Sequence, residues 1–118
     1  MQLELITRIK EGVLVVECSG RIVFGEESVR LRDTIKELIS QNNSIVLNLA
    51  RTSYIDSGGL GSLVALYTTA RNSGGAIKLA NLTKRVGDLL QVTKLLTVFE
   101  VFDSEHRAVE SFERAAVA

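Results

Sequence analysis

The sequence predicts an α/β fold, a single mixed β-sheet of four to five strands packed with about four helices. Short apolar or β-branched runs alternate along the chain with longer segments whose apolar residues recur at helical spacing. Glycine and polar residues separate these segments. Strands that alternate with helices are typical of a mostly parallel or mixed sheet with helices packed on it. Because crossovers between parallel strands are right-handed, few topologies remain.

The first two strands form a predicted hairpin. Apolar and polar residues alternate over 3–9, which indicates a strand. Gly12 marks a turn, and the β-branched run 13–18 follows it. Residues 21–24 either extend this second strand or lead away from it.

The middle of the chain predicts a helix and then a buried strand. The helix covers 26–40, and its apolar residues form one stripe at i, i+4, i+7 and i+8: Leu31, Ile35, Leu38 and Ile39. The polar segment 41–44 is a stop and turn signal. Residues 45–49 are almost continuously apolar, which favours a strand covered on both faces.

The second half predicts three more helices and two more strands. A helix over 57–72 ends before Gly74-Gly75, and 76–80 is a short strand. Thr83 is a candidate cap for a third helix. Residues 98–102 are a last strand candidate, and Asp103 or Ser104 can cap a final helix. The predicted order is therefore β-β-α-β-α-β-α-β-α.

Length, charge and hydropathy exclude several classes of protein. The 118 residues suit one domain, 1–118. Lys plus Arg and Asp plus Glu number 14 each, without a basic run, so we expect no nucleic-acid partner. Apolar runs fall short of the ~20 residues that span a bilayer, and 1–9 lack a signal-peptide core. We therefore expect a cytoplasmic protein without membrane association.

The residue types needed for catalysis or metal binding are scarce. Cys18 lies in an apolar stretch and is expected to be buried, and one cysteine forms neither an internal disulfide nor a zinc site. No His, Cys, Asp and Glu cluster has metal-ligand spacing. The single histidine, His106, falls in the predicted last helix and is expected at the surface. We expect no enzyme, no cofactor and no metal.

The most unusual segment is 52–63, which follows a buried strand and opens a helix. The first turn of a helix has unpaired N–H groups and a positive dipole end. Asp56 or Ser57 can cap these donors, and the nearby glycines let another backbone or an anion approach. A hydroxyl here would be exposed, and a phosphate on it would be tolerated. The plain alternative is that Ser57 is an ordinary helix cap.

Two catalytic hypotheses for this segment require residues that it does not contain. A phosphate-binding P-loop needs a lysine after its glycines, and here Leu60-Gly61-Ser62 follows instead. A serine hydrolase needs a base beside its nucleophile. A nucleotide-binding protein or enzyme therefore stays a minor hypothesis.

The run Tyr54-Ile55-Asp56-Ser57-Gly58-Gly59-Leu60-Gly61 resembles the signature of STAS domains, in particular bacterial anti-sigma-factor antagonists. That signature is a hydrophobic residue, Asp-Ser, a small residue, glycine, an aliphatic residue and glycine. Segments 45–49, 74–75 and 93–99 also fall where the family has similar segments. The resemblance covers nearly the whole chain and implies the STAS fold.

The resemblance also implies a function. Ser57 would be phosphorylated by an anti-sigma factor that is a serine kinase. The unphosphorylated chain would bind the anti-sigma factor, free the sigma factor and so regulate transcription indirectly, and a phosphoserine phosphatase would reset it. The residues implied in partner binding are Asp56, Ser57, Gly58, Gly59, Leu60 and Gly61.

The chain departs from the family pattern at two places. Gly58 stands where the family often has serine after the acceptor. Arg21-Ile22-Val23-Phe24 stands where many members have an acidic residue near the partner surface, which puts the identity of the partner in doubt. We expect Val23 and Phe24 to be core residues rather than an exposed anchor.

Two further alternatives stay open. The chain is alternatively a non-switching STAS scaffold subunit of a larger signalling or transport complex. Thr52 and Ser53 are either further modification sites or ordinary hydroxyls at a turn or strand end.

Overall fold

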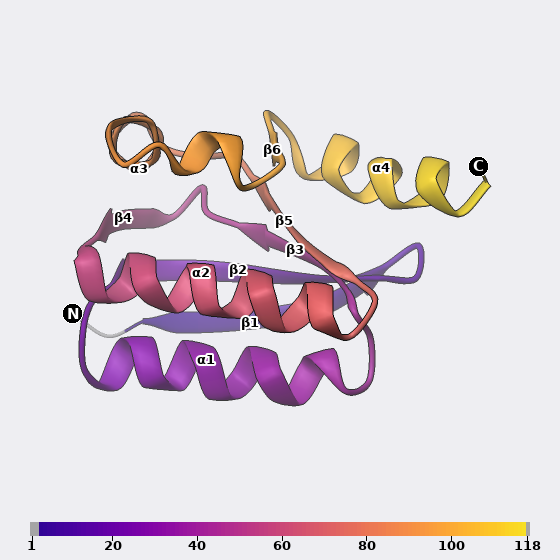
Figure 1. The fold of residues 1–118 in the computed structure, drawn as a ribbon, viewed down its shortest axis with the longest axis horizontal. Coiled ribbons are helices and arrows are strands. Elements are labelled where there is room, and N and C mark those ends of the chain that lie inside the picture. Colours follow the sequence, from indigo (N-terminus) through magenta and orange to yellow (C-terminus); the bar gives the residue numbers. More distant parts are fainter. Residues whose placement is uncertain (1–2, 118) are drawn as a thin grey trace.

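The computed structural model describes residues 3–117, with side chains described for residues 3–112. The strands are β1 (Glu4–Lys10), β2 (Val13–Ile22), β3 (Ser44–Asn48), β4 (Thr52–Ile55), β5 (Ala76–Ala80) and β6 (Val101–Phe102). The helices are α1 (Glu26–Ile39), α2 (Ser57–Asn72), α3 (Lys84–Val92), α4 (Glu105–Val117) and the short 3₁₀-helix η1 (Leu95–Thr97). Figure 1 shows their arrangement.

Within the described residues the six strands form one mixed sheet. Its main order is β1-β2-β3-β5-β6, and β4 pairs with β2 beside this path. β1 and β2 are the predicted antiparallel hairpin, and every other pairing is parallel. The predicted fold class is therefore confirmed.

Strand β4 is the element that the sequence pattern did not predict. β3 pairs with the first part of β2, and β4 pairs with its last part. Gly20 pairs with Thr52 and Ile22 with Ile55. Only Thr52 and Ile55 of its four residues are buried, so no apolar alternation marks it as a strand. The pairing also explains why β2 continues to Ile22, a point that the sequence left open.

The last strand is shorter than predicted. Residues 98–102 were expected to be extended, but Val98 and Phe99 donate their N–H groups to the carbonyl of Leu95. The chain therefore curls through η1 and only Val101 and Phe102 pair with β5.

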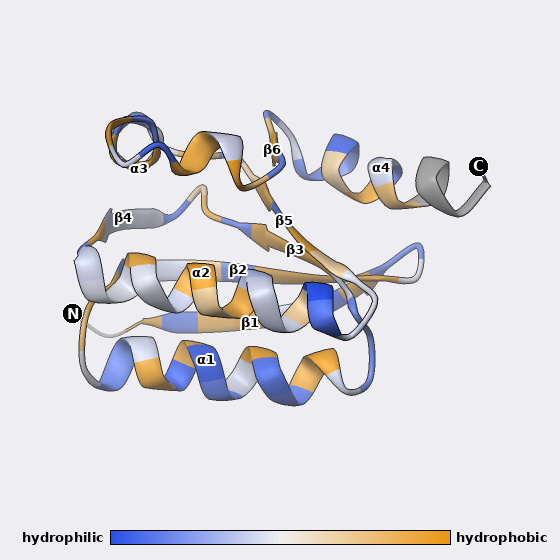
Figure 2. Cartoon of the chain, viewed as in Figure 1, coloured by the Kyte–Doolittle hydropathy of each residue, from blue (hydrophilic) through white to orange (hydrophobic). Residues whose placement is uncertain are grey.

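The core has two parts because both faces of the sheet are covered. The larger part joins the sheet to α1, α2 and α3, and the smaller part joins it to α4. In β3, Ile45 and Leu47 belong to the larger part and Val46 to the smaller. This confirms the strand covered on both faces. In Figure 2, hydrophilic and hydrophobic bands alternate along α1, as expected for a helix with one face on the sheet.

Candidate functional site

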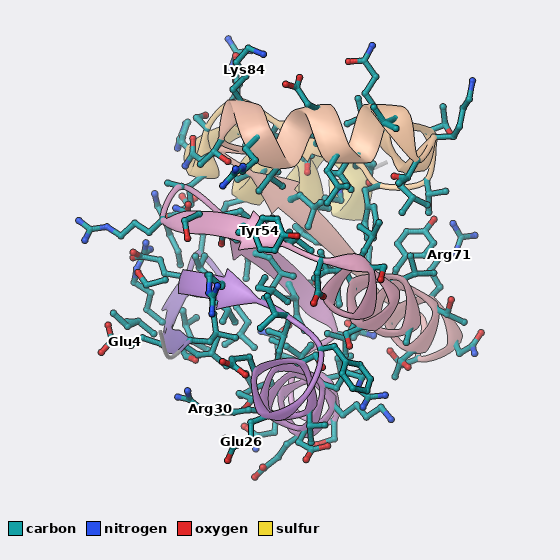
Figure 3. All side chains as sticks on the ribbon, turned by 90° about the vertical axis from the view of Figure 1, so that its left-hand side faces the viewer. Glu4, Glu26, Arg30, Tyr54, Arg71 and Lys84 are labelled. Atoms are coloured by element: carbon teal, nitrogen blue, oxygen red, sulfur yellow. The ribbon has the colours of Figure 1, made fainter. Side chains whose placement is uncertain are left out.

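The candidate site lies where α1 and α2 begin. β2 leads into α1, β4 leads into α2, and these two strands are parallel neighbours. Both helices therefore start at the same end of the molecule (Figure 1). Figure 3 looks onto this end, with Glu26 and Arg30 marking the first turns of α1 and Tyr54 on β4.

Asp56 is the cap of α2 and also ties two connections together. Its Oδ1 accepts a hydrogen bond from the Gly59 N–H at 2.8 Å. Both carboxylate oxygens accept from the Phe24 N–H, at 3.0 and 3.1 Å. The hydrogen bond from Gly59, and then that from Phe24, lowers the pKa of Asp56, because these donors favour the charged carboxylate. Asp56 therefore stays ionised and fixes the β2–α1 connection against the start of α2.

Two glycines let α2 begin against the end of β2. A Cβ on Gly59 would lie 1.9 Å from the carbonyl oxygen of Ile22, so any side chain there would force the backbone apart. A Cβ on Gly58 would lie 2.5 Å from the Cβ of Phe24. Gly61 is different, because nothing lies within 4 Å of the position its Cβ would take.

Ser57 is the first residue of α2, directly after its cap, and it is exposed. Its hydroxyl makes no hydrogen bond to any residue that the structure describes. The two sequence alternatives for capping are thereby resolved, since Asp56 provides the cap and the Ser57 hydroxyl does not. This hydroxyl is accessible and its modification breaks no structural bond.

A surface hollow of about 400 Å³ adjoins Ser57. It lies between the first turns of α1 and α2, and we call it the Ser57 hollow. Its lining residues are Phe24, Gly25, Ser28, Val29, Arg32, Ser57, Gly58, Gly61 and Ser62.

Phe24 is not a core residue, so the sequence prediction for it was wrong. Its exposed fraction is 80%, and Val29 beside it on the hollow is 43% exposed. The backbone of Phe24 is held by Asp56, and the absence of a side chain at Gly58 leaves room for it at the surface. Val23 is half-buried.

The residues implied in partner binding divide between surface and interior. Ser57 and Gly61 are exposed, and Asp56 and Gly58 are partly exposed. Gly59 and Leu60 are buried, and the Leu60 side chain belongs to the main core. These two residues therefore support the start of α2 from inside rather than presenting a surface.

Sequence reasoning missed three lining residues of α1, Ser28, Val29 and Arg32. Their place beside Ser57 comes from the pairing of β2 with β4, which brings together segments about thirty residues apart. The one local signal is Phe24-Gly25, an aromatic residue and a glycine directly before an acidic helix start.

The neighbouring hydroxyls have structural roles. Thr52 is fully buried, and its hydroxyl donates to the carbonyl of Cys18 at 2.8 Å. The exposed Ser53 donates to the carbonyl of Gly20 at 3.3 Å. These bonds match the ordinary role of strand-end hydroxyls. Tyr54 is exposed beside them (Figure 3). The Arg85 guanidinium lies 5.4 Å from the centre of its ring.

The remaining candidate reactive groups lie elsewhere. The exposed His106 is on α4, 3.7 Å from Glu110 on the same helix. Cys18 is buried as predicted, and burial raises the pKa of its thiol to about 12. Among the described residues, no three His, Cys, Asp or Glu side chains are grouped as metal ligands would be. None of the helices in that part of the chain has the length and apolar character of a membrane span.

The fold and the site together define a small α/β module that presents one free serine at a capped helix start. A family model described as the STAS domain matches residues 4–108. The chain belongs to the STAS domain family.

Three known proteins illustrate the similarity. The anti-sigma F factor antagonist of Paenibacillus polymyxa is 29% identical over 115 residues, covering 96% of this chain and 97% of that protein. An anti-sigma factor antagonist from Mycobacterium paratuberculosis has a crystal structure that matches with a TM-score of 0.81 and 20% identity, covering 93% of each chain. The Bacillus cell fate determinant SpoIIAA in its phosphorylated form matches with a TM-score of 0.69 and 19% identity, covering 93% of this chain and 98% of that one. The two structural matches show the shared fold.

Proposed function

We propose that this protein is an anti-sigma factor antagonist that works as a phosphorylation switch in the cytoplasm. It binds an anti-sigma factor that is also a serine kinase while Ser57 is unphosphorylated, and it releases this partner once Ser57 is phosphorylated. The observation that carries the proposal is the exposed Ser57 hydroxyl, which no described residue binds and which stands beside a carboxylate held in its charged form.

The proposed contact surface is the Ser57 hollow with its rim. Phe24 and Val29 supply exposed apolar area on one side, and Ser57 and Gly61 lie on the other. Exposed aromatic residues are common anchors of protein interfaces, because they bury a large apolar area. Gly59 and Leu60 act beneath this surface by holding the start of α2 against β2.

The chemistry of a phosphoserine accounts for release. A phosphate on Ser57 adds about −1.5 to −2 charges next to the ionised Asp56. In a docked complex this like-charge pair would also lose its water, at a cost of several kcal/mol. Because each 1.4 kcal/mol is tenfold in affinity, a loss on the order of a thousandfold follows. The fold itself is spared, since the Ser57 hydroxyl bonds to no described residue.

Two findings from relatives support this proposal. The relative from Paenibacillus polymyxa is named an anti-sigma F factor antagonist, and its similarity to this chain extends over nearly its whole length. A structural neighbour has been solved in a phosphorylated form. By this analogy a phosphoserine phosphatase returns the protein to its binding state.

A phosphorylation assay tests the acceptor. The protein is incubated with ATP and the anti-sigma serine kinases of the same cell, and phosphopeptides are mapped by mass. We expect one phosphate in wild type and in the matched control Ser53→Ala, and none in Ser57→Ala. A stable complex that forms without any phosphate transfer, or a phosphate retained by Ser57→Ala, would contradict the switch and favour a scaffold subunit.

A further inference from the structure

Arg32 on α1 is an unpaired arginine that faces the same hollow as Ser57. Its Nε has less than 1 Å² of accessible area and no hydrogen-bond partner among the described residues. Enclosed polar atoms in proteins are almost always hydrogen-bonded, so this donor requires an explanation.

Two other arginines have acceptors. Arg8 of β1 binds the carboxylates of Glu105 and Glu17, and Arg30, two residues before Arg32 on α1, donates to the carbonyl of Leu3. The carboxylate closest to Ser57 along the chain is Asp56, and its oxygens are already engaged by the N–H groups of Gly59 and Phe24. Arg32 therefore lines the hollow without a hydrogen-bond acceptor among the described residues.

We propose that Arg32 is the receptor for the phosphate that Ser57 carries. A guanidinium presents N–H groups in a planar fork that matches the oxygens of a phosphate. The two terminal nitrogens of Arg32 are the donors that a phosphate would meet, since its Nε is enclosed. Arg32 is the one charged side chain among the residues that line the hollow. The inference rests on the proposed function in one respect, that Ser57 is the residue that bears the phosphate.

This contact adds a second cause of release to charge repulsion. A phosphate bound by Arg32 lies across the hollow between α1 and α2, where the partner would otherwise dock beside Phe24 and Val29. It also partly neutralises the repulsion between the phosphate and Asp56, which keeps the modified domain folded. In the phosphorylated protein the phosphate therefore has an acceptor-matched cation within the domain, and it occupies the surface on which the partner would dock.

The test uses phosphoserine inserted at position 57 during translation, so it needs no kinase. The second ionisation of the phosphate is followed by ³¹P NMR against pH; its ordinary pKa is about 6. Because a nearby cation favours the dianion, we expect the pKa in wild type to lie at least about 0.5 units below that in Arg32→Gln, roughly threefold in proton affinity. Arg32→Lys keeps the charge but not the fork, and should lie between them.

Arg51→Gln is the matched control, because Arg51 is exposed and lies outside the lining of the hollow. It should titrate as wild type does. Unphosphorylated Arg32→Gln should unfold in urea as wild type does, since Arg32 has no partner to lose. Equal phosphate pKa values in wild type and Arg32→Gln would overturn the proposal, whereas Ser57 could still be a kinase acceptor. Conversely, a failed kinase assay would leave this titration unaffected.

Discussion

At the scale of single residues, the start of α2 contains both glycines that the packing requires and one that it does not require. Gly59 lies under the carbonyl of Ile22, and no rotation of a side chain relieves a clash with backbone. Gly61 lies two residues further on the same helix, exposed, with open space around its Cβ position. The pair therefore offers a matched comparison of the same substitution.

Gly59→Ala should lower the free energy of unfolding by about 1–3 kcal/mol, because the added methyl forces α2 away from β2. Gly61→Ala should raise it by about 0.5–1 kcal/mol, because alanine is the better helix former. Urea denaturation of both variants beside wild type measures the two changes. Equal effects of the two substitutions would contradict the described packing of α2 on β2.

The identity of these residues shows what sequence can and cannot reveal. The position of Ser57 at a helix start was predictable, because the glycine-rich segment and the apolar stripe that follows it are local signals. The exposure of Phe24 was not, since it depends on the hydrogen bonds that the Phe24 N–H donates to the carboxylate of Asp56, thirty-two residues later. Arg32 is hidden from sequence reasoning for the same reason, because an unpaired atom is defined only by its surroundings.

At the scale of elements, α4 is fastened to the sheet through its first residue. Glu105 accepts hydrogen bonds from Arg8 of β1 at 2.6 and 2.7 Å and from Asn48 of β3 at 2.9 Å. The hydrogen bonds from Arg8 are the largest cause that lowers the pKa of Glu105 from 4.5 to about 2. The side chain of Glu105 is only 13% exposed and that of Arg8 is 41% exposed, so the link is enclosed at Glu105 and open to solvent at Arg8.

This link predicts part of the response of the protein to acid. A carboxylate with a lowered pKa stabilises the fold fully above its unfolded pKa of about 4.5 and loses that contribution as the pH falls towards 2. Allowing for the partial exposure of Arg8, we expect on the order of 1–2 kcal/mol. Glu105→Gln should therefore lower stability at pH 7 and flatten its decline between pH 4.5 and 2.

Urea unfolding measured at several pH values checks this prediction. Glu37→Gln, which changes an exposed carboxylate on α1, is the control and should follow the wild-type profile. If the Glu105→Gln and wild-type profiles run parallel between pH 4.5 and 2, Glu105 is not a tightly bound carboxylate.

Elements differed in how well the sequence predicted them, for physical reasons. The predicted helices lie within a few residues of α1, α2, α3 and α4, because amphipathic periodicity and caps are encoded locally. β4 was missed because it is held by pairing with β2 rather than by an apolar pattern. The length of the last strand was overestimated because the apolar residues that follow α3 form a 3₁₀-helix instead of extended backbone.

At the scale of the whole molecule, the face of the sheet covered by α4 is distinct from the end that carries Ser57. α4 and its link to β1 and β3 close one face. α1 and α2 begin at the same end of the molecule (Figure 1), and the Ser57 hollow lies between their first turns. The Ser57 hydroxyl makes no hydrogen bond to a described residue. Under the proposed function, a modification at this end alters the proposed docking surface without unfolding the domain.

The most direct test is the affinity of the protein for its anti-sigma factor with and without phosphoserine at position 57. Calorimetric titration of the two purified forms, with Ser57→Ala as the unmodifiable control, gives the comparison. We expect unmodified protein and Ser57→Ala to bind alike, and the phosphorylated form to bind on the order of a thousandfold more weakly. Equal affinities of the phosphorylated and unphosphorylated forms would contradict the switch.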